Sequence, residues 1–299
     1  MGEKGGAPVK RFRTDRLTRW HALAALVMAL LGVAATYPAW ADIYHIAHVD
    51  EEYSHIFIVP LVALYLVWVR RARLRHLRPS GMLIGPLVVL LGGTLSLVGF
   101  YQNVESFWHA GAVVVVVGAV LSVLGKNVMF QFFPVALVLI FLIPTPGRVR
   151  QQVALPLQKW TAHSAQVIFE TLGTEAEVSG CTLSVNGTSV TVAEACNGLR
   201  MVFALILVTF AFAFGMPLRN SVRALILLAS PLAAIFCNVV RLLPTVWVYA
   251  HASRTTADTV HDYAGWAMLP IAIGLLYGII RALRWAMIPV TRYTLAGQG

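Results

Sequence analysis

The stretch from Phe107 to Gly125 reads FWHAGAVVVVVGAVLSVLG and contains no Asp, Glu, Lys or Arg. A helix of this length rises about 28 Å, close to the hydrocarbon thickness of a bilayer, which is roughly 30 Å. Comparable apolar runs lie at about 21–41, 55–69, 82–100, 127–144, 197–215, 222–250 and 264–283. The sequence therefore predicts an all-α membrane protein with about eight transmembrane helices.

The composition agrees with a membrane protein. Of the 299 residues, 58% are hydrophobic and only 12% are charged, with a mean hydropathy of +0.74. Because a soluble domain carries about a quarter charged residues, these values argue against a soluble enzyme. The net charge of +10 comes from basic residues at the ends of apolar runs, so we expect membrane lipids and not nucleic acid as partners.

The distribution of charge predicts the topology. If the N-terminus is inside, 17 of the 23 Lys and Arg residues lie inside, 4 lie outside, and Arg200 and Arg241 fall within predicted spans. Membrane insertion keeps the side rich in Lys and Arg cytoplasmic. We therefore expect an inner-membrane protein with both termini cytoplasmic: a basic lead at 1–20, a single transmembrane catalytic domain at 21–290 and a tail at 291–299.

The first span has an alternative interpretation. Ala39-Trp40-Ala41 follows a basic lead and an apolar run, as a signal-peptidase site does. The run is long for a signal peptide, which favours an uncleaved first span over cleavage.

The only long segment outside the apolar runs is 145–195, which this topology places outside. Between Arg148 and Leu172 the spacing of apolar residues predicts an interfacial helix, with Pro156 as a possible kink or restart. From Cys181 onward, polar and β-branched residues alternate around Asn186-Gly187, which predicts a short β-hairpin before the sixth span. This helix and hairpin lead directly into Cys196.

The chain has three cysteines, Cys181, Cys196 and Cys237. Their number and spacing fit neither a disulfide framework nor a zinc site, and we expect no metal and no cofactor. Cys196 stands at the start of a helical run, where the helix dipole favours a thiolate, and Arg200 follows on the same face one turn deeper. The alternative is that Cys196 is a small buried apolar residue and Arg200 a snorkelling anchor.

Arg241 and His261 complete a candidate catalytic group with Cys196. An arginine within a span usually faces a cavity or a partner, and Asn238 lies three residues earlier on the same helix face; a snorkelling arginine is the alternative. His261 falls in a predicted outer loop, His251–Asp262, and suits acid–base chemistry near neutral pH. Other histidines on the predicted outer side are rivals: His45, His48, His55 and His251.

Placed at one outer level, these three residues fit acyl transfer through a thioester. The thiolate attacks a peptide carbonyl, the imidazolium protonates the leaving amine, and the guanidinium holds the oxyanion or the substrate.

At these residues the sequence resembles the exosortase/archaeosortase family of integral-membrane transpeptidases. The matching stretches, in the family's order, are Tyr53–Pro60, Phe141–Pro146, Glu194–Arg200, Asn238–Arg241 and His261–Gly265. Two positions differ from the usual pattern: Ile56, where the family has Gly, and Asn197, where Ser is commoner. The resemblance implies Cys196 as nucleophile, with Arg241 and His261 as its catalytic partners.

The resemblance further implies a membrane-embedded cysteine protease or transpeptidase acting at the extracytoplasmic face, often alongside exopolysaccharide production. Its substrates would be exported proteins with a C-terminal sorting signal made of a short motif, a transmembrane helix and a basic tail. We expect Ser54, His55 and the 145–195 segment to bind the motif. A transporter or lipid-handling protein with an arginine-lined pathway is the main alternative, and a non-catalytic scaffold of polysaccharide assembly is another.

Overall fold

The computed structural model describes residues 17–76, 83–191 and 198–285. In chain order the helices are α1 (Arg19–Ala35), α2 (Tyr37–Val49), η1 (Glu51–Ile58), α3 (Val59–Val69), η2 (Arg71–His76), α4 (Ile84–Tyr101), α5 (Glu105–Leu124), α6 (Lys126–Gln131), α7 (Phe133–Val138), η3 (Leu139–Leu142), α8 (Gly147–Thr171), α10 (Gly198–Gly215), α11 (Asn220–His251) and α12 (Arg254–Trp285), where η marks a 3-10 helix. The strands are β1 (Ala176–Ser179), β2 (Thr182–Val185) and β3 (Thr188–Thr191). The protein is therefore mainly helical with one small sheet.

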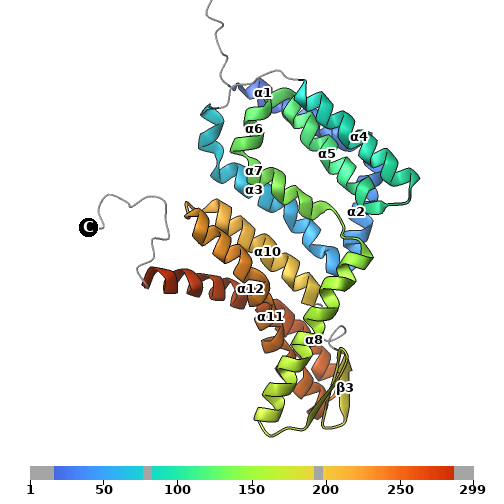
Figure 1. Cartoon of the computed structure of the whole chain (residues 1–299), viewed down its shortest axis with the longest axis vertical. Helices are drawn as coiled ribbons and strands as arrows, with labels where there is room; N and C mark the ends of the chain where they lie inside the picture. The colour runs from blue at the N-terminus through green and yellow to red at the C-terminus, as the bar shows by residue number, and fades with distance from the viewer. Residues whose placement is uncertain (1–16, 77–82, 192–197, 286–299) are drawn as a thin grey trace, which may run out of the picture.

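The helices form an elongated stack (Figure 1). Helices α1, α4 and α5 lie at one end, α3, α7 and α10 occupy the middle, and α8, α11, α12 and the sheet form the other end. Buried apolar residues of η1, α3, α7 and α10 share one cluster, and those of α10, α11 and α12 share a second. Helix α10 thus joins the two halves of the molecule.

Within the described residues, four helical segments are long and apolar enough to span a membrane, or up to six if each bent pair counts as one span. The apolar parts of α10 and α12, Val202–Gly215 and Ile273–Leu283, are shorter than a full span. A multi-pass membrane protein is therefore confirmed, while the eight spans stay a prediction.

Two of the predicted runs are broken, unlike the single helices expected. The run at 21–41 divides into α1 and α2, which meet at Thr36 with a bend of 81°. Pro38 lies in the first turn of α2. Because proline has no N–H and its ring clashes with the carbonyl four residues earlier, α1 cannot continue through it. The run at 127–144 is likewise divided into α6, α7 and η3, with Pro134 in the first turn of α7.

Glycines bring α4 and α5 into backbone contact. Gly85, Gly92 and Gly99 repeat every seven residues along α4 and are buried. A Cβ on Gly92 would meet Val115 N at 2.7 Å and Gly111 O at 2.9 Å. Lipid supplies no hydrophobic force between helices, so small residues that allow close backbone approach stabilise such a pair.

We expect Gly92→Ala to destabilise the protein by about 1–3 kcal/mol, because the added methyl must push the two backbones apart. Its neighbour Gly93 has no atom within 4 Å of a Cβ position, so Gly93→Ala should keep or raise stability, by up to about 1 kcal/mol. Thermal unfolding of the purified variants in detergent measures both. Equal losses for the two would contradict this packing.

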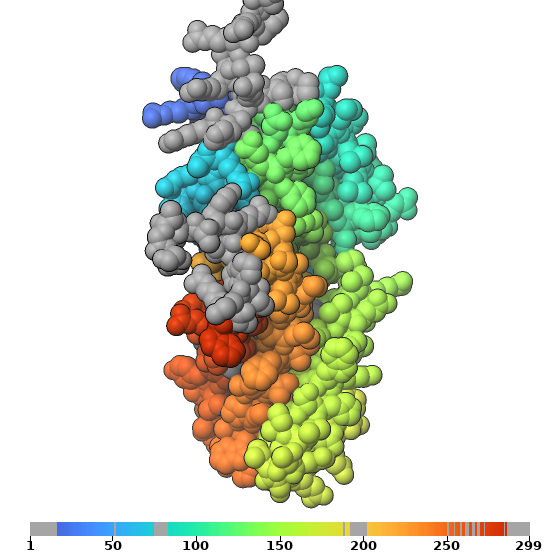
Figure 2. All heavy atoms as spheres, turned by 60° about the vertical axis from the view of Figure 1, so that its left-hand side comes forward, coloured from blue at the N-terminus to red at the C-terminus, as the bar shows by residue number. Residues whose placement is uncertain are grey.

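The described part of the 145–195 segment, up to Thr191, forms the helix and hairpin that the sequence predicts. Helix α8 runs unbroken through Pro156 and lies along α11, as Figure 2 shows. Strands β2 and β3 pair antiparallel around Asn186 and Gly187, which have φ of 50° and 79° and make the positive-φ turn expected of Asn-Gly. Strand β1, which the sequence pattern does not predict, adds a third antiparallel strand in the order β1-β2-β3.

The sheet is held to the helices by its own apolar core. Leu183 and Val185 of the sheet are fully buried, together with Phe169 of α8 and with Leu242 and Val246 of α11. This core fixes the C-terminal half of α11, which carries Asn238 and Arg241.

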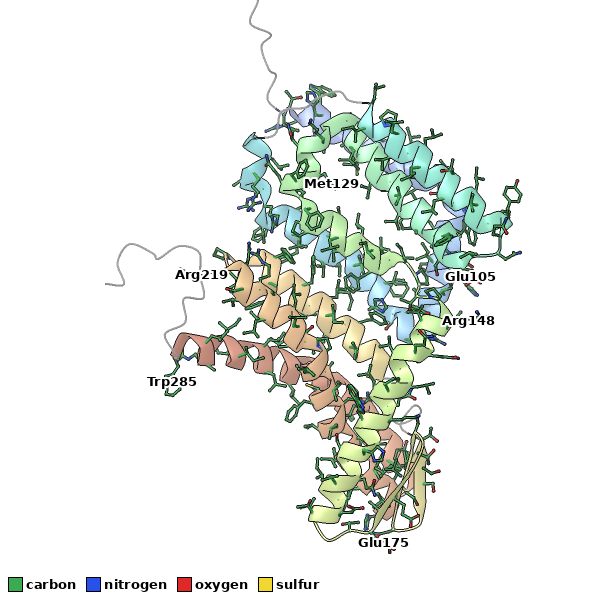
Figure 3. The ribbon with its side chains drawn as sticks, in the orientation of Figure 1. Glu105, Met129, Arg148, Glu175, Arg219 and Trp285 are labelled. Carbon is green, nitrogen blue, oxygen red and sulfur yellow. The ribbon has the colours of Figure 1, made fainter. Side chains whose placement is uncertain are left out.

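The ends of the helices fall on two sides of the molecule. In Figure 3, Met129, Arg219 and Trp285 lie toward the upper left, and Glu105, Arg148 and Glu175 toward the lower right. Arg70 donates to Gln131 O at 3.3 Å and to Phe214 O at 3.2 Å. These bonds join the ends of α3, α6 and α10 on the upper left side. This division is compatible with the predicted inner and outer segments, and the assignment of one side to the cytoplasm stays a prediction.

Candidate active site

The predicted nucleophile and its neighbours are only partly described. Cys196 lies outside the described residues, two positions before α10 begins at Gly198. The backbones of Arg200 and His261 lie in α10 and α12, and nothing is described of either side chain. The other two cysteines are free, with Cys237 buried and Cys181 partly exposed.

The predicted outer loop around His261 is wrong. Helix α12 begins at Arg254, so only Ala252 and Ser253 separate it from α11. The Ser253 hydroxyl accepts a hydrogen bond from Thr256 N at 3.3 Å, which is the geometry of a helix N-cap. Polar residues from Arg254 to Asp262 looked like a loop, but this stretch has no Gly or Pro to stop a helix.

Helix geometry places the backbones of Arg241 and His261 at one level, that is, at similar distances from the turn between α11 and α12. Arg241 lies eleven residues before Ala252 and His261 nine residues after it, on neighbouring helices that run in opposite directions. At 1.5 Å per residue these backbones lie roughly 16 Å and 14 Å from the turn. The positions of these two backbones are therefore compatible with Arg241 and His261 acting in one site.

The start of α10 points toward the same level. Val202 and Leu205 of α10 share a buried cluster with Ala234 and Cys237 of α11. Helices α10 and α11 are consecutive, antiparallel neighbours. Arg241, one turn beyond Cys237, therefore lies toward the end at which α10 begins.

Arg241 is buried inside protein. Its side chain is only 6% exposed, and Leu242 and Thr245 beside it are fully buried. A snorkelling arginine would instead extend its guanidinium to the membrane surface, so the structure favours the interpretation of Arg241 as a residue facing a protein interior. The burial of a charge is costly unless polar groups surround it, and this is the environment expected of a functional arginine.

Asn238 connects this region to α8. Its Nδ2 donates to Thr161 Oγ1 at 3.3 Å, and Thr161 in turn donates to Leu157 O at 2.8 Å. Asn238 is 5% exposed. Its Oδ1 is buried and accepts no hydrogen bond from any described residue. Asn238 therefore fixes α11 to α8 and keeps one acceptor unused.

Helix η1 and Asp50 before it are clamped to the start of α8. The Tyr53 hydroxyl donates to Thr145 O at 2.8 Å, and Arg150 lies 2.9 Å from carboxylate oxygens of both Asp50 and Glu52. Ile56, which departs from the family pattern, is 5% exposed and packs in the core below the loop. Two stretches far apart in sequence, Tyr53–Pro60 and Phe141–Pro146, are thereby brought together.

We expect Arg150→Ala to loosen this clamp by about 1 kcal/mol, since the ion pairs are partly exposed and the two carboxylates then repel each other. Amide hydrogen exchange across residues 50–58 should become roughly fivefold faster. Arg148→Ala is the matched control, because Arg148 is exposed at the same helix start. If both variants exchange at the wild-type rate, Arg150 does not hold the loop.

His55 lies between this loop and α10. It is 5% exposed, its ring stacks on Phe203 with centroids 4.8 Å apart, and its Nδ1 lies 3.1 Å from Glu52 O. Ser54 beside it is partly exposed. A cavity of about 140 Å³ opens here, lined by Tyr53, His55, Ile140, Phe141, Ile143, Thr145 and Phe203. The predicted substrate-binding loop thus borders the helix that follows Cys196.

The other three rival histidines, His45, His48 and His251, do not line this cavity. His45 and His48 belong to α2, and His251 is exposed at the end of α11, ten residues beyond Arg241. His109 is fully buried and pairs with Asp42 across α5 and α2 at 2.9 Å, a pair that no sequence pattern predicts. Among the described residues, no three His, Cys, Asp or Glu side chains gather as metal ligands would.

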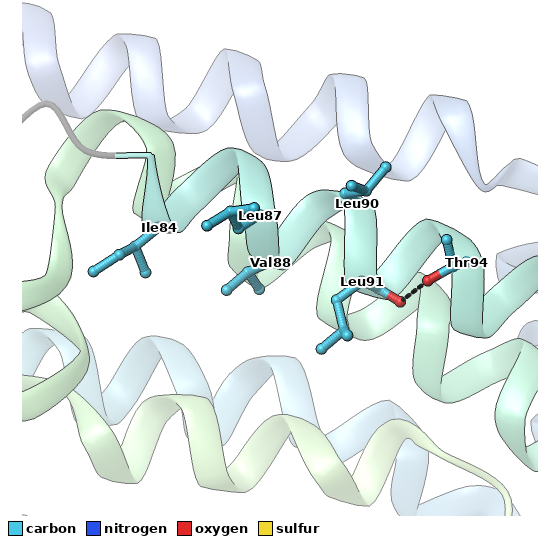
Figure 4. Close-up of a pocket in the computed structure, with 6 residues that line it drawn as sticks. All are labelled: Ile84, Leu87, Val88, Leu90, Leu91 and Thr94. Atoms are coloured by element: carbon cyan, nitrogen blue, oxygen red, sulfur yellow. Dashed lines mark hydrogen bonds between the residues drawn. The ribbon is translucent and has the colours of Figure 1, made fainter.

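A larger hollow of about 430 Å³ lies on the outer surface of α4. Figure 4 shows that all six of its residues come from this one helix. Its only hydroxyl, on Thr94, donates to Leu91 O at 2.9 Å within the same helix. With no converging polar groups, this surface is suited to lipid and not to chemistry.

Comparison with protein families assigns the chain. The model of the transmembrane exosortase family matches residues 40–278, which include every stretch on which the resemblance rests. No curated protein and no solved structure matches the chain. Since the match covers most of the sequence, from Trp40 in α2 to Gly278 in α12, the chain belongs to the transmembrane exosortase family.

Proposed function

We propose that this exosortase is a membrane-embedded cysteine protease or transpeptidase that cleaves the C-terminal sorting signals of exported proteins. The observation that carries the proposal is the common level of three backbones: Arg241, His261 and the start of α10, just after Cys196. A buried arginine at this level meets the need for a charged donor in a site that excludes water.

In the proposed reaction, the Cys196 thiolate attacks the carbonyl carbon of the scissile peptide bond. The guanidinium of Arg241 stabilises the negative charge on the carbonyl oxygen. As the C–N bond breaks, the amine takes a proton from the His261 imidazolium, and a thioester remains on Cys196. Water or an amine then attacks the thioester and gives its proton to neutral His261. The C–S bond breaks, and the Cys196 thiolate and the His261 imidazolium are restored.

The topology suits a substrate anchored in the same membrane. The Met129, Arg219 and Trp285 side of the molecule carries the predicted inner segments, and the sheet lies toward the other side (Figure 3). A substrate helix lying in lipid beside α10 would present its outer end to Cys196. Its basic tail would stay with the inner positive segments, as the positive-inside rule requires.

Mass spectrometry of a co-expressed exported reporter tests the proposal. The reporter carries a C-terminal tail made of a short motif, an apolar helix and basic residues. Cells that express the enzyme should yield a reporter shortened near the motif, with a free carboxylate if water is the acceptor or an added mass if an amine is. A panel of such tails that all remain intact would overturn the proposed function.

A further inference from the structure

We infer that the 140 Å³ cavity beside Phe203 is the subsite that selects one side chain of the substrate's recognition motif. This subsite rests on the proposed function and would determine the specificity of the enzyme for one residue of its substrate. The subsite should take a single compact apolar side chain, no larger than a benzene ring.

The size of the cavity sets this limit. A dry protein cavity of about 150 Å³ binds one benzene molecule, and this cavity has about 140 Å³. Four of the lining side chains carry rings, those of Tyr53, His55, Phe141 and Phe203. Aromatic rings give large, rigid contact surfaces. The stack of His55 on Phe203 closes one side. An indole side chain would therefore not fit without moving a wall.

Polar atoms on the wall are available for the substrate backbone. Thr145 Oγ1 is buried and makes no hydrogen bond with any described residue. His55 Nδ1 faces the carbonyl of Glu52, which only accepts, so Nδ1 carries the proton and neutral His55 keeps Nε2 as an acceptor. A buried hydroxyl without a partner is unfavourable, and an extended peptide supplies a C=O that the Thr145 hydroxyl could donate to.

The position of the cavity sets which substrate residue enters it. Phe203 lies five residues after the start of α10, which is roughly 7 Å along the helix axis. An extended peptide advances about 3.4 Å per residue. Because Cys196 lies two residues before that start, which adds up to about 7 Å, the selected side chain should lie two to four residues from the peptide bond that Cys196 attacks.

Changing the wall should change the preference at one substrate position. The probe is a reporter panel in which each residue of the motif is replaced in turn by Ala, Val, Leu, Phe or Trp, with cleavage followed by immunoblot. Phe203→Ala should raise cleavage of the Trp reporter relative to the Val reporter tenfold or more at a single motif position. In an apolar pocket, one methylene group more or less already changes the preference between two substrates by roughly tenfold or more. Phe212→Ala, another partly buried phenylalanine of α10 outside the cavity, should leave the ratio unchanged.

Thr145→Val provides a second variant that keeps the shape of the wall and removes the hydroxyl. It should lower cleavage of all reporters severalfold without changing their order. The inference is overturned if cleavage depends on Cys196 but Phe203→Ala and Phe212→Ala give the same preference, or if Phe203→Ala is inactive and Thr145→Val cleaves like the wild type. Cleavage that does not depend on Cys196 would overturn the proposed function instead.

Discussion

Cells that produce Cys196→Ala in place of the wild type are expected to accumulate uncleaved substrate, with processing reduced at least about 1,000-fold. Loss of a catalytic nucleophile removes the covalent step, and what remains is the weak catalysis of the surrounding site. Processing is measured by immunoblot of a co-expressed reporter, with the amount of enzyme in the membrane determined in parallel. Cys196→Ser should be nearly as defective, because a serine hydroxyl does not ionise near neutral pH.

The other two cysteines are internal controls for this experiment. Cys181 lies in the turn between β1 and β2 and is partly exposed, so Cys181→Ala should retain full processing. Cys237 is fully buried in the core shared by α10, α11 and α12, so Cys237→Ala should reduce stability and not the rate per folded molecule. Complete processing by Cys196→Ala would refute the thioester mechanism and favour a transporter or a scaffold, which needs no thiol.

Much of this architecture follows from apolar periodicity. The runs near 82–100, 107–125 and 222–250 correspond closely to α4, α5 and α11, because an uninterrupted apolar stretch of this length has no alternative to a helix in lipid. The Asn186-Gly187 hairpin was equally predictable, since this pair adopts the positive φ angles that a tight antiparallel turn requires.

The errors have local physical causes. Pro38 and Pro134 divide runs that hydropathy alone treats as continuous. Strand β1 is only four residues long, and its pairing with β2 is a tertiary property that its sequence does not reveal. The polar neighbours of His261 favour a loop, whereas Ser253 as an N-cap and the absence of Gly and Pro favour the helix that is observed.

In the candidate site, too, features set by nearby residues were predictable and contacts between distant residues were not. The burial of Arg241 was predictable, since a charge within an apolar run requires protein around it. The clamp of Arg150 on Asp50 spans 100 residues, and the stack of His55 on Phe203 joins η1 to α10. No periodicity encodes either contact, so the cavity beside Phe203 became visible only in three dimensions.

Arg241→Gln is expected to reduce the cleavage rate per folded molecule at least about 100-fold, the loss typical when an oxyanion donor is removed from a closed site. Glutamine keeps much of the length and one donor group but loses the positive charge. Arg241→Lys should fall between Gln and wild type, because its ammonium keeps the charge without the planar fork of donors.

A second arginine of the same helix separates catalysis from stability. Arg223 donates from Nε to Ala213 O at 2.8 Å and stacks over Phe214 at 4.7 Å, at the other end of α11. Both Arg223→Gln and Arg241→Gln remove an arginine from packed protein, so both should lower the unfolding temperature in detergent. Only Arg241→Gln should also lower cleavage once rates are divided by the amount of folded enzyme.

The order of the three rates carries the mechanistic argument. If the guanidinium acts on the reacting carbonyl, the cleavage rates must fall from Arg223→Gln through Arg241→Lys to Arg241→Gln. The substrate concentration for half-maximal rate should change little, because the negative charge that the guanidinium stabilises develops only in the transition state. A rate for Arg241→Gln equal to that of Arg223→Gln would show that Arg241 supports the fold alone. Unchanged turnover with weakened substrate binding would instead assign its guanidinium to holding the substrate peptide.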